Sequence, residues 1–374
     1  SDGQEATFVA RLGLDGSWDW AVDMDNTSVN VHTQLDVDAN GNAYFSGVFD
    51  RRTPGGQPAD CNCAVEWNGT EYTNHDTRNY GYIAKVNTDG SEGYLRRYSG
   101  NSNGLVIDAI SVDSTYLYFA TEFSPRDVET DTSCAPSAGI IIVRLNSDGT
   151  CNGHQTGSLN LNSWHYTSKV DINSLKVSNN GDFYVTGEFI GELNFGGHTI
   201  DSYCWSTGPE SGACSNMYFI AKGNMYPGWS WANGDNNMNH QTASDSYGSS
   251  IDFDSSGNPI LVGSVNTSSA FAGHSTTTYG GFDLFVAQFF GNNGTVDWVA
   301  TAGSSGTERA DDIYIDSEGV VNVVGRIGKE GSPTNANTVS FGQHSIDNRF
   351  SRGYIARYNS TLSAWTSVSA VGDN

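Results

Sequence analysis

The sequence predicts an all-β protein, and three observations carry that prediction. Glycine is abundant, with 44 copies among 374 residues, and residues that favour helices are few. The apolar residues are largely Val, Ile, Tyr, Phe and Trp, whose side chains suit a pleated, half-buried surface. Short runs of these residues also return along the chain at intervals of roughly 60 to 80 residues, which indicates a repeated unit. We therefore expect many short strands arranged in one repeating pattern of sheets.

The clearest element of the repeat is an apolar run of three residues that ends in a basic or amide residue. A glycine-containing turn follows most copies, for example at Asp89-Gly90, and an aromatic strand comes next. Asp-Gly between two apolar runs is a strong signal for a hairpin. The six copies of the run are Phe8–Arg11, Tyr82–Lys85, Ile141–Arg144, Phe219–Lys222, Phe285–Gln288 and Tyr354–Arg357.

A second hairpin precedes each internal copy of this run. Its first strand leads into a turn rich in Asp, Asn and Gly, and its second strand reads Tyr-Val-Thr-Gly or a variant. The copy between Val112 and Thr121 is degenerate. Each repeat therefore predicts four strands, named a, b, c and d, in an antiparallel meander with tight a–b and c–d turns and a long b–c connection. The clear copies of this hairpin start at Leu35, Leu175, Ile251 and Ile313.

Four strands per unit, repeated at a period above about 40 residues, are the signature of a β-propeller. Because one four-stranded sheet buries little apolar surface, neighbouring sheets must pack face to face. Residues 6–28 supply only a c–d hairpin. We therefore expect one domain over residues 1–374, with an N-terminal half-blade followed by five full blades in a five- or six-bladed ring. The expected full blades span residues 30–102, 105–167, 171–245, 246–305 and 308–371.

The order of these motifs is most regular between Val177 and Ala232, where a turn is followed by Tyr-Val-Thr-Gly, Phe-Ile-Ala-Lys and Gly-x-Trp. This order resembles the SBBP β-propeller repeats of bacteria and archaea. The resemblance covers the chain from about Ala6 to Val368. It implies an extracellular propeller of poorly defined general function, and it offers no catalytic residues to transfer.

Charge excludes two classes of partner. Acidic residues outnumber basic ones by 42 to 18, which gives a net charge of −24. Such a surface repels phosphate backbones and anionic lipids, so we expect no nucleic-acid partner. No stretch approaches the roughly 20 apolar residues that span a bilayer, so we expect no membrane insertion. The same charge suits cations such as Ca²⁺, or solubility in salty water.

Cysteines and glycosylation motifs favour an exported protein, either extracellular or attached to the cell surface. Six cysteines allow 15 pairings. Cys204 and Cys214 bracket a short loop and predict one disulfide. Either Cys61 or Cys63 is expected to pair with Cys134, which lies in the equivalent loop of the next repeat. The five Asn-x-Ser/Thr motifs, each a candidate glycosylation site, are at Asn26, Asn68, Asn266, Asn293 and Asn359.

One turn is a candidate calcium site. Asp36, Asp38 and Asn40 alternate and are followed by Gly41, which resembles the start of a calcium-binding loop. The complete EF-hand pattern needs Glu at its twelfth position, where this chain has Gly47. The competing interpretation is an ordinary turn in which an Asp side chain accepts hydrogen bonds from nearby backbone N–H groups.

One isolated motif and two sets of recurring residues are interpreted as structural rather than functional. The segment Gly100–Gly104 matches G-x-S-x-G, but it joins two strands rather than a strand and a helix. The tryptophans of strand d are expected to pack between blades. The basic residues of strand c are expected to pair with carboxylates between blades. These basic residues are Arg11, Lys85, Arg144, Lys222 and Arg357.

Three functions remain after these exclusions, and the sequence leans against an enzyme. The main hypothesis is a non-enzymatic structural or adhesive scaffold that binds protein or glycan through the long b–c connections. A first alternative is a self-assembling surface polymer, hence a homo-oligomer, that uses the N-terminal hairpin. A second alternative is a carbohydrate-active hydrolase, which would need two convergent carboxylates near the axis.

Overall fold

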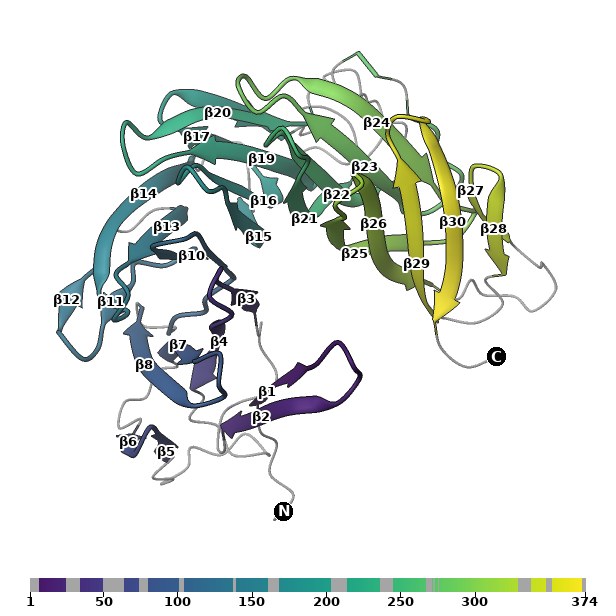
Figure 1. Ribbon diagram of the computed structural model, residues 1–374. Coiled ribbons are helices and arrows are strands. Elements are labelled where there is room, and N and C mark those ends of the chain that lie inside the picture. The colour runs from purple at the N-terminus through teal and green to yellow at the C-terminus, as the bar shows by residue number, and fades with distance from the viewer. Residues whose placement is uncertain are drawn as a thin grey trace, which may run out of the picture. The chain divides into compact units, whose positions relative to one another are not determined.

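The computed structural model describes most of the chain, and the described part is entirely β (Figure 1). It contains 30 strands and no helix, which confirms the predicted all-β class. Accordingly, no helix in this part is long and apolar enough to cross a membrane. The described residues are 7–24, 34–49, 64–73, 80–100, 104–136, 139–160, 168–202, 214–235, 245–266, 271, 273–274, 276–328, 338–347 and 352–371.

The chain divides into two compact units, and each is described by itself. Unit 1 comprises Ser1–Gly157 and Val177–Asp182, and unit 2 comprises Ser158–Lys176 and Phe183–Asn374. The expected single domain and its blade boundaries stay predictions.

Unit 1 begins with a hairpin and continues with a sheet in the expected a-b-c-d order. A short hairpin from the second b–c connection extends this sheet beyond its strand d. Another hairpin lies in the first b–c connection. The first hairpin consists of β1 (Thr7–Leu12) and β2 (Trp18–Met24). The sheet consists of β3 (Leu35–Val37), β4 (Ala43–Phe49), β7 (Tyr80–Val86), β8 (Glu92–Ser99), β11 (Arg126–Asp127) and β12 (Thr132–Ser133). The hairpin of the b–c connection consists of β5 (Ala64–Trp67) and β6 (Thr70–Thr73).

A second sheet of unit 1 packs face to face on the first. Ile83 and Tyr98 of the first sheet share one apolar core with Phe119, Ile141 and Val143 of the second, and all five are fully buried. This contact confirms that neighbouring sheets share their apolar faces within the unit. The strands of the second sheet are β9 (Ala109–Val112), β10 (Leu117–Thr121), β13 (Ile140–Leu145) and β14 (Cys151–Asn160).

Unit 2 contains three sheets of four strands, each again in a-b-c-d order (Figure 1, teal to yellow). The first is β15 (Lys169–Val177), β16 (Phe183–Ile190), β19 (Met217–Gly223) and β20 (Trp229–Gly234). The second is β21 (Ser246–Phe253), β22 (Pro259–Val265), β23 (Asp283–Phe289) and β24 (Val296–Ala302). The third is β25 (Glu308–Ile315), β26 (Val320–Ile327), β29 (Arg352–Asn359) and β30 (Ala364–Val371).

Short hairpins occupy two b–c connections of unit 2, and a histidine ends the turn of each. His198 pairs in register with Phe195, and His344 pairs with Phe341. Both histidines are exposed, as expected for turn residues. The hairpins are β17 (Glu192–Phe195) with β18 (His198–Asp201), and β27 (Thr338–Phe341) with β28 (His344–Asp347).

Two apolar cores hold the three sheets of unit 2 together. Ile220 of the first sheet and Leu261 and Phe285 of the second belong to one core, and all three are fully buried. Val286 of the second sheet and Val323 of the third belong to the other and are equally buried. Side chains of both faces of the middle sheet are thus removed from water, which explains why strand β23 is buried at all seven positions.

A β-bulge recurs at one position of the repeat. The pairing of strands c and d shifts register beside the basic or amide residue that ends the apolar run. A bulge bends the strand and increases its local twist, so strand c of each repeat is bent at the same position. The shifts lie at Arg11/Leu12, Ala84/Val86, Arg144/Leu145, Lys222/Gly223, Gln288/Phe289 and Arg357/Tyr358.

Candidate functional site

In unit 2 the repeat brings chemically active side chains to one end of the sheets. Asp171, Tyr247 and Arg309 each lie four positions before the repeated Leu or Ile of strand a. Since strand b runs antiparallel to strand a, the starts of the a strands and the ends of the b strands lie at the same end. Tyr247 pairs in register with Ser264, and Arg309 pairs with Arg326. The b–c connections also leave from this end, which we call the b–c end.

A charged cluster marks the b–c end of the first sheet. The Lys169 Nζ donates to Asp171 Oδ2 at 3.0 Å and to Glu188 Oε1 at 3.1 Å. The Glu188 side chain is only 13% exposed. Burial raises the pKa of the Glu188 carboxyl to about 7, against the opposing effect of Lys169, and Asp171 raises it further through a shared hydrogen bond. The Glu188 carboxyl therefore gains or loses its proton near neutral pH.

Aromatic rings continue this surface onto the next sheet. The centroids of the Tyr247 and Phe282 rings are 5.1 Å apart, with their planes inclined by 42°. The Arg309 guanidinium carbon lies 5.7 Å from the centroid of the Phe282 ring, within the range of a cation–π contact. Both rings are half-buried and Arg309 is exposed. Burial raises the pKa of the Tyr247 hydroxyl, so it is protonated and able to donate at neutral pH.

A recess of about 460 Å³ opens beside Arg309 at the b–c end of the third sheet. Arg309, Arg326 and Arg352 line it together with Ile327. Arg326 is held by Asp311 through two parallel hydrogen bonds of 2.8 Å each. The recess is therefore lined by three guanidinium groups, one of them fixed by Asp311, and its volume lies within the range of about 300–1,000 Å³ typical of ligand pockets.

The predicted calcium residues are engaged in other contacts, in unit 1. The Asp38 Oδ1 accepts hydrogen bonds from the N–H groups of Asn40 and Asn42, each at 2.9 Å. The Asp36 Oδ2 instead accepts from Val112 N–H at 2.8 Å. The two carboxylates thus accept hydrogen bonds from different segments. Asp38 forms an ordinary turn in which its side chain accepts from nearby backbone N–H groups. Among the described residues no group of three or more Asp, Glu, His or Cys side chains is placed to hold a metal. Calcium at this turn stays a prediction.

One disulfide differs from the expectation. Cys134 is bonded to Cys151, so the predicted pairing of Cys134 with Cys61 or Cys63 is wrong. The physical reason is that the connection between β10 and β13 pairs through β11 with β8 of the first sheet, and this path brings the Cα atoms of Cys134 and Cys151 to 5.5 Å. Cys61 and Cys63 lie outside the described residues. Cys214 is disulfide-bonded, but its predicted partner Cys204 also lies outside them.

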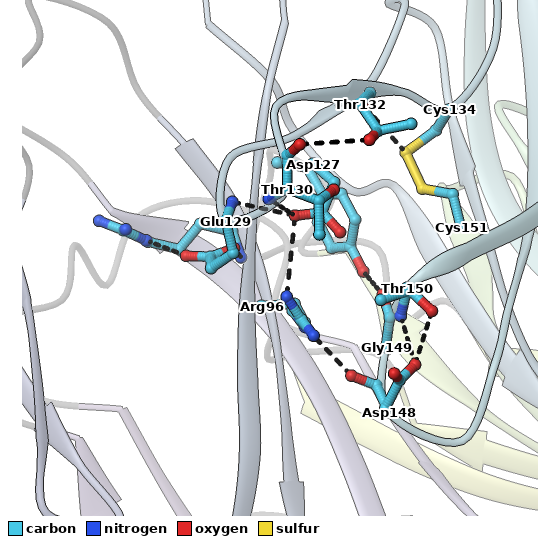
Figure 2. Close-up of polar contacts among 12 residues, drawn as sticks. Arg96, Asp127, Glu129, Thr130, Thr132, Cys134, Asp148, Gly149, Thr150 and Cys151 are labelled. Atoms are coloured by element: carbon cyan, nitrogen blue, oxygen red, sulfur yellow. Dashed lines mark hydrogen bonds and ion pairs between the residues drawn. A yellow bond between two sulfur atoms is a disulfide. The ribbon is translucent and has the colours of Figure 1, made fainter.

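A polar network surrounds this disulfide (Figure 2). Asp127 is fully buried, and its Oδ1 accepts from the N–H groups of Glu129 at 3.0 Å and Thr130 at 3.2 Å. Arg96 of β8 donates to Asp148 O at 3.1 Å and lies 4.0 Å from Asp127 Oδ1. These bonds fasten the β11–β12 connection to the first sheet and to the β13–β14 turn. The network is therefore a clamp within unit 1.

The glycosylation candidates lie in different environments. Asn68 and Asn293 are exposed. Asn266 is half-buried, and its side-chain oxygen accepts from Asp245 N–H at 2.8 Å. Asn359 is half-buried and accepts from Leu362 N–H at 3.0 Å. Asn26 lies outside the described residues. Glycosylation at the five sites stays a prediction.

The basic residues of strand c mostly contact tyrosines of their own sheet. The Nζ atoms of Lys85 and Lys222 lie 5.7 Å and 5.4 Å from the ring centroids of Tyr44 and Tyr184. Arg357 pairs with Asp316 of its own sheet at 2.8 Å. The carboxylate partner of Arg357 thus lies in its own sheet rather than between sheets, and Lys222 Nζ donates to a backbone oxygen of the neighbouring sheet, Gly291 O, at 2.9 Å.

The expectation for the strand-d tryptophans is confirmed in unit 2 at Trp231 and Trp365. Trp365 is 6% exposed, and its Nε1 donates to Thr301 O of the neighbouring sheet at 3.2 Å. Trp231 is 4% exposed, and its Nε1 donates to Gly291 O of the neighbouring sheet at 3.2 Å.

Sequence reasoning did not identify Glu188, Tyr247 or Arg309. One pattern in the sequence could have pointed to this surface. The residue four places before the repeated Leu or Ile of strand a varies between Asp, Tyr and Arg. Variation at one fixed place of a repeat is typical of a surface that is free from packing constraints.

Comparisons with known proteins give a general likeness only. No family model matches the chain, and no curated protein matches it. Among solved structures, an α-L-arabinanase of Penicillium chrysogenum complexed with arabinobiose is 12% identical with a TM-score of 0.41, covering 91% of this chain and 92% of that one. The extracellular domain of a hybrid two-component system of B. thetaiotaomicron is 9% identical with a TM-score of 0.25, covering 92% and 53%.

The exotype rhamnogalacturonan lyase YesX is 9% identical with a TM-score of 0.27, covering 93% and 83%. Likenesses of this strength carry no argument about the activity of this chain.

Proposed function

We propose that the protein is an extracellular, non-enzymatic β-propeller that binds a glycan at the b–c end of unit 2. The observation that carries the proposal is the row formed by Tyr247, Phe282 and Arg309, which opens beside a recess of about 460 Å³. The face-to-face packing of consecutive sheets in each unit supports a ring of five or six blades.

A sugar ring has an apolar face of C–H groups and a rim of hydroxyls, and this surface offers a partner for each. The half-buried rings of Tyr247 and Phe282 provide an apolar face of aromatic carbon. Lys169 and Arg309 provide donors at either side, and Asp171 and Glu188 provide acceptors. Rigid strands hold these groups, so little ordering is required when a ligand binds.

An exported location is supported by the disulfide between Cys134 and Cys151. Disulfides persist in oxidising compartments and are rare in the cytosol of most organisms. The SBBP resemblance, with its expectation of an extracellular propeller, points the same way.

Binding without cleavage is favoured by the geometry of the carboxyl pair. The catalytic carboxyls of glycosidases are about 5–5.5 Å apart in retaining enzymes and about 6.5–9.5 Å apart in inverting ones. Asp171 and Glu188 both accept a hydrogen bond from Lys169 Nζ, so their spacing is set by the ammonium group that they share rather than by a glycosidic bond. The raised pKa of Glu188 would suit an acid catalyst, but this spacing does not.

A glycan array probed with the intact chain tests the proposal. We expect retention of a defined set of glycans, roughly tenfold weaker binding by Tyr247→Ala, and no cleavage products when the retained glycans are incubated with the protein. Tyr314→Ala is the matched control, because Tyr314 lies on the same strand as Arg309 and is 64% exposed. Absence of any retained glycan would contradict the proposal, and released fragments would restore the hydrolase alternative.

Self-association through the first hairpin is a second candidate, favoured by one observation. Phe8 is 72% exposed, whereas the residues at its repeat position in other sheets, among them Tyr82, Phe219 and Phe285, are fully buried. A second copy of the chain is the proposed partner for this apolar face.

Light scattering after size-exclusion chromatography tests this candidate. We expect a dimer or larger species for the intact chain and a monomer for Phe8→Ser. Leu14→Ser, in the exposed turn of the same hairpin, is the control. A strictly monomeric intact chain at all concentrations would refute it.

A further inference from the structure

The arginines of the recess are unusual for a chain of this charge. Only 18 of the 374 residues are basic and 42 are acidic, yet three arginines line one recess. Random placement of so few cations would scatter them among the carboxylates. Their concentration indicates a local requirement for positive charge within an otherwise acidic surface.

The strand register sharpens this point. Arg309 and Arg326 are directly opposite each other on neighbouring antiparallel strands. Like charges at directly opposed positions destabilise a sheet, and an anion placed between them removes that cost. Asp311 supplies one such anion, and both of its oxygens are occupied by Arg326.

Arg309 is held differently. Its guanidinium lies over the ring of Phe282, and among the described residues no carboxylate pairs with it. It is exposed and faces the recess. A guanidinium stacked on an aromatic ring keeps its N–H groups in the plane, where they match the two oxygens of a carboxylate.

We infer that the recess binds a saccharide that carries a carboxylate, that is, a uronic acid unit. The carboxylate accepts two hydrogen bonds from Arg309, and the sugar ring lies against the neighbouring ring of Phe282. This inference rests on the proposed glycan-binding function and names the ligand class of the same surface. The assigned anion is a carboxylate; a sulfate also presents two oxygens to a guanidinium edge, so a sulfated ligand is included in the test.

Calorimetric titration with two matched ligands tests the inference. The first ligand is a tetrasaccharide of hexuronic acid, and the second is the same tetrasaccharide with its carboxyls reduced to alcohols. We expect the intact protein to bind the acidic ligand at least tenfold more tightly. Arg309→Gln should lose most of that preference while it still binds the reduced ligand, and Arg309→Lys should fall between the two because it keeps the charge but not the paired donors.

The control variant is Arg11→Gln, since Arg11 is an exposed arginine of unit 1 that pairs with Asp19 at 3.1 Å. It should bind both ligands as the intact protein does. Arg309 is exposed, so its variants should keep the melting temperature of the parent. Equal affinity for the two ligands, or no effect of Arg309→Gln, overturns the inference and leaves the glycan-binding function intact.

Other outcomes separate the two proposals. If the protein binds neither tetrasaccharide and no glycan on the array, both the glycan-binding function and the uronic acid inference are wrong. Tighter binding of a sulfated neutral tetrasaccharide than of the uronate shows an anion site without carboxylate selectivity, which overturns the inference. Tighter binding of an oligoglutamate peptide overturns it in favour of an acidic protein partner.

Discussion

Replacing Glu188 by glutamine should stabilise unit 2 above neutral pH. The pKa of this carboxyl is about 7 in the folded protein, compared with an ordinary value of 4.5, chiefly because the side chain is buried. A group whose folded pKa is raised binds its proton more tightly when folded. Its stabilising contribution is therefore present in full below pH 4.5 and is lost as the pH rises through 7. Glutamine keeps the shape and the neutrality of the protonated carboxyl at every pH.

The size of the effect follows from the shift. A rise from 4.5 to about 7 corresponds to at most about 3 kcal/mol at pH 9, at 1.36 kcal/mol per unit. Solvent screens the pair, since the Asp171 side chain is 50% exposed, and Lys169 loses one of its two partners in the variant. We therefore expect a gain of about 1 kcal/mol at pH 9. For a unit of this size that gain raises the melting temperature by about 2–4 °C.

Thermal unfolding at pH 5, 7 and 9 checks this expectation. Glu188→Gln should match the parent at pH 5, where the native carboxyl is already protonated, and should exceed it at pH 9. Glu318→Gln, a variant at an exposed turn, should show no such dependence. A Glu188→Gln variant that melts below the parent at pH 9, and at least as far below it as at pH 5, would refute the reasoning. It would show that the ion pair with Lys169 stabilises the fold more than burial of the charge destabilises it.

Three further predictions concern the clamp of unit 1 and the packing of unit 2. The double variant Cys134→Ser and Cys151→Ser should lose about 3 kcal/mol in urea unfolding, as expected for a closed loop of 17 residues, and an unchanged urea midpoint would show that this bond does not stabilise unit 1. Asp127→Ala should lose about 2 kcal/mol because it leaves the N–H groups of Glu129 and Thr130 without their acceptor; an unchanged urea midpoint would disprove the clamp. Trp231→Phe should lose about 1 kcal/mol with the bond to Gly291, measured in the same way, and no loss would show that this bond is replaced by water.

The strands and turns were predictable because their signals are local. Alternating apolar runs, Asp-Gly turns and a Tyr-Val-Thr-Gly strand depend on neighbours a few residues apart, so the repeated a-b-c-d order is legible in the sequence. The turn at Asp38 is also local, since its carboxylate accepts from backbone groups within four residues. Sequence reasoning therefore offered that turn as one of two interpretations, with calcium as the other.

The disulfide and the basic side chains were predicted less well because their partners are set by register and by loop path. Cys134 bonds to Cys151 because the connection between β10 and β13 runs beside β8 of the first sheet, and nothing in the spacing of the cysteines specifies that path. Lys222 lies over Tyr184 because the two are opposite in the pairing of β16 and β19. A shift of one residue in that pairing would place a different side chain under the ammonium group.

By itself, the sequence determined the all-β class, the repeated hairpins and the acidic charge that disfavours nucleic acid and membranes, because each depends on composition or on short-range pattern. Only the tertiary structure decided that Glu188 is buried between Lys169 and Asp171, and that Arg309 meets Phe282 beside a recess. Those environments join residues that are tens of positions apart in the chain. Burial and electrostatic coupling act through space, so they appear only once the sheets have packed.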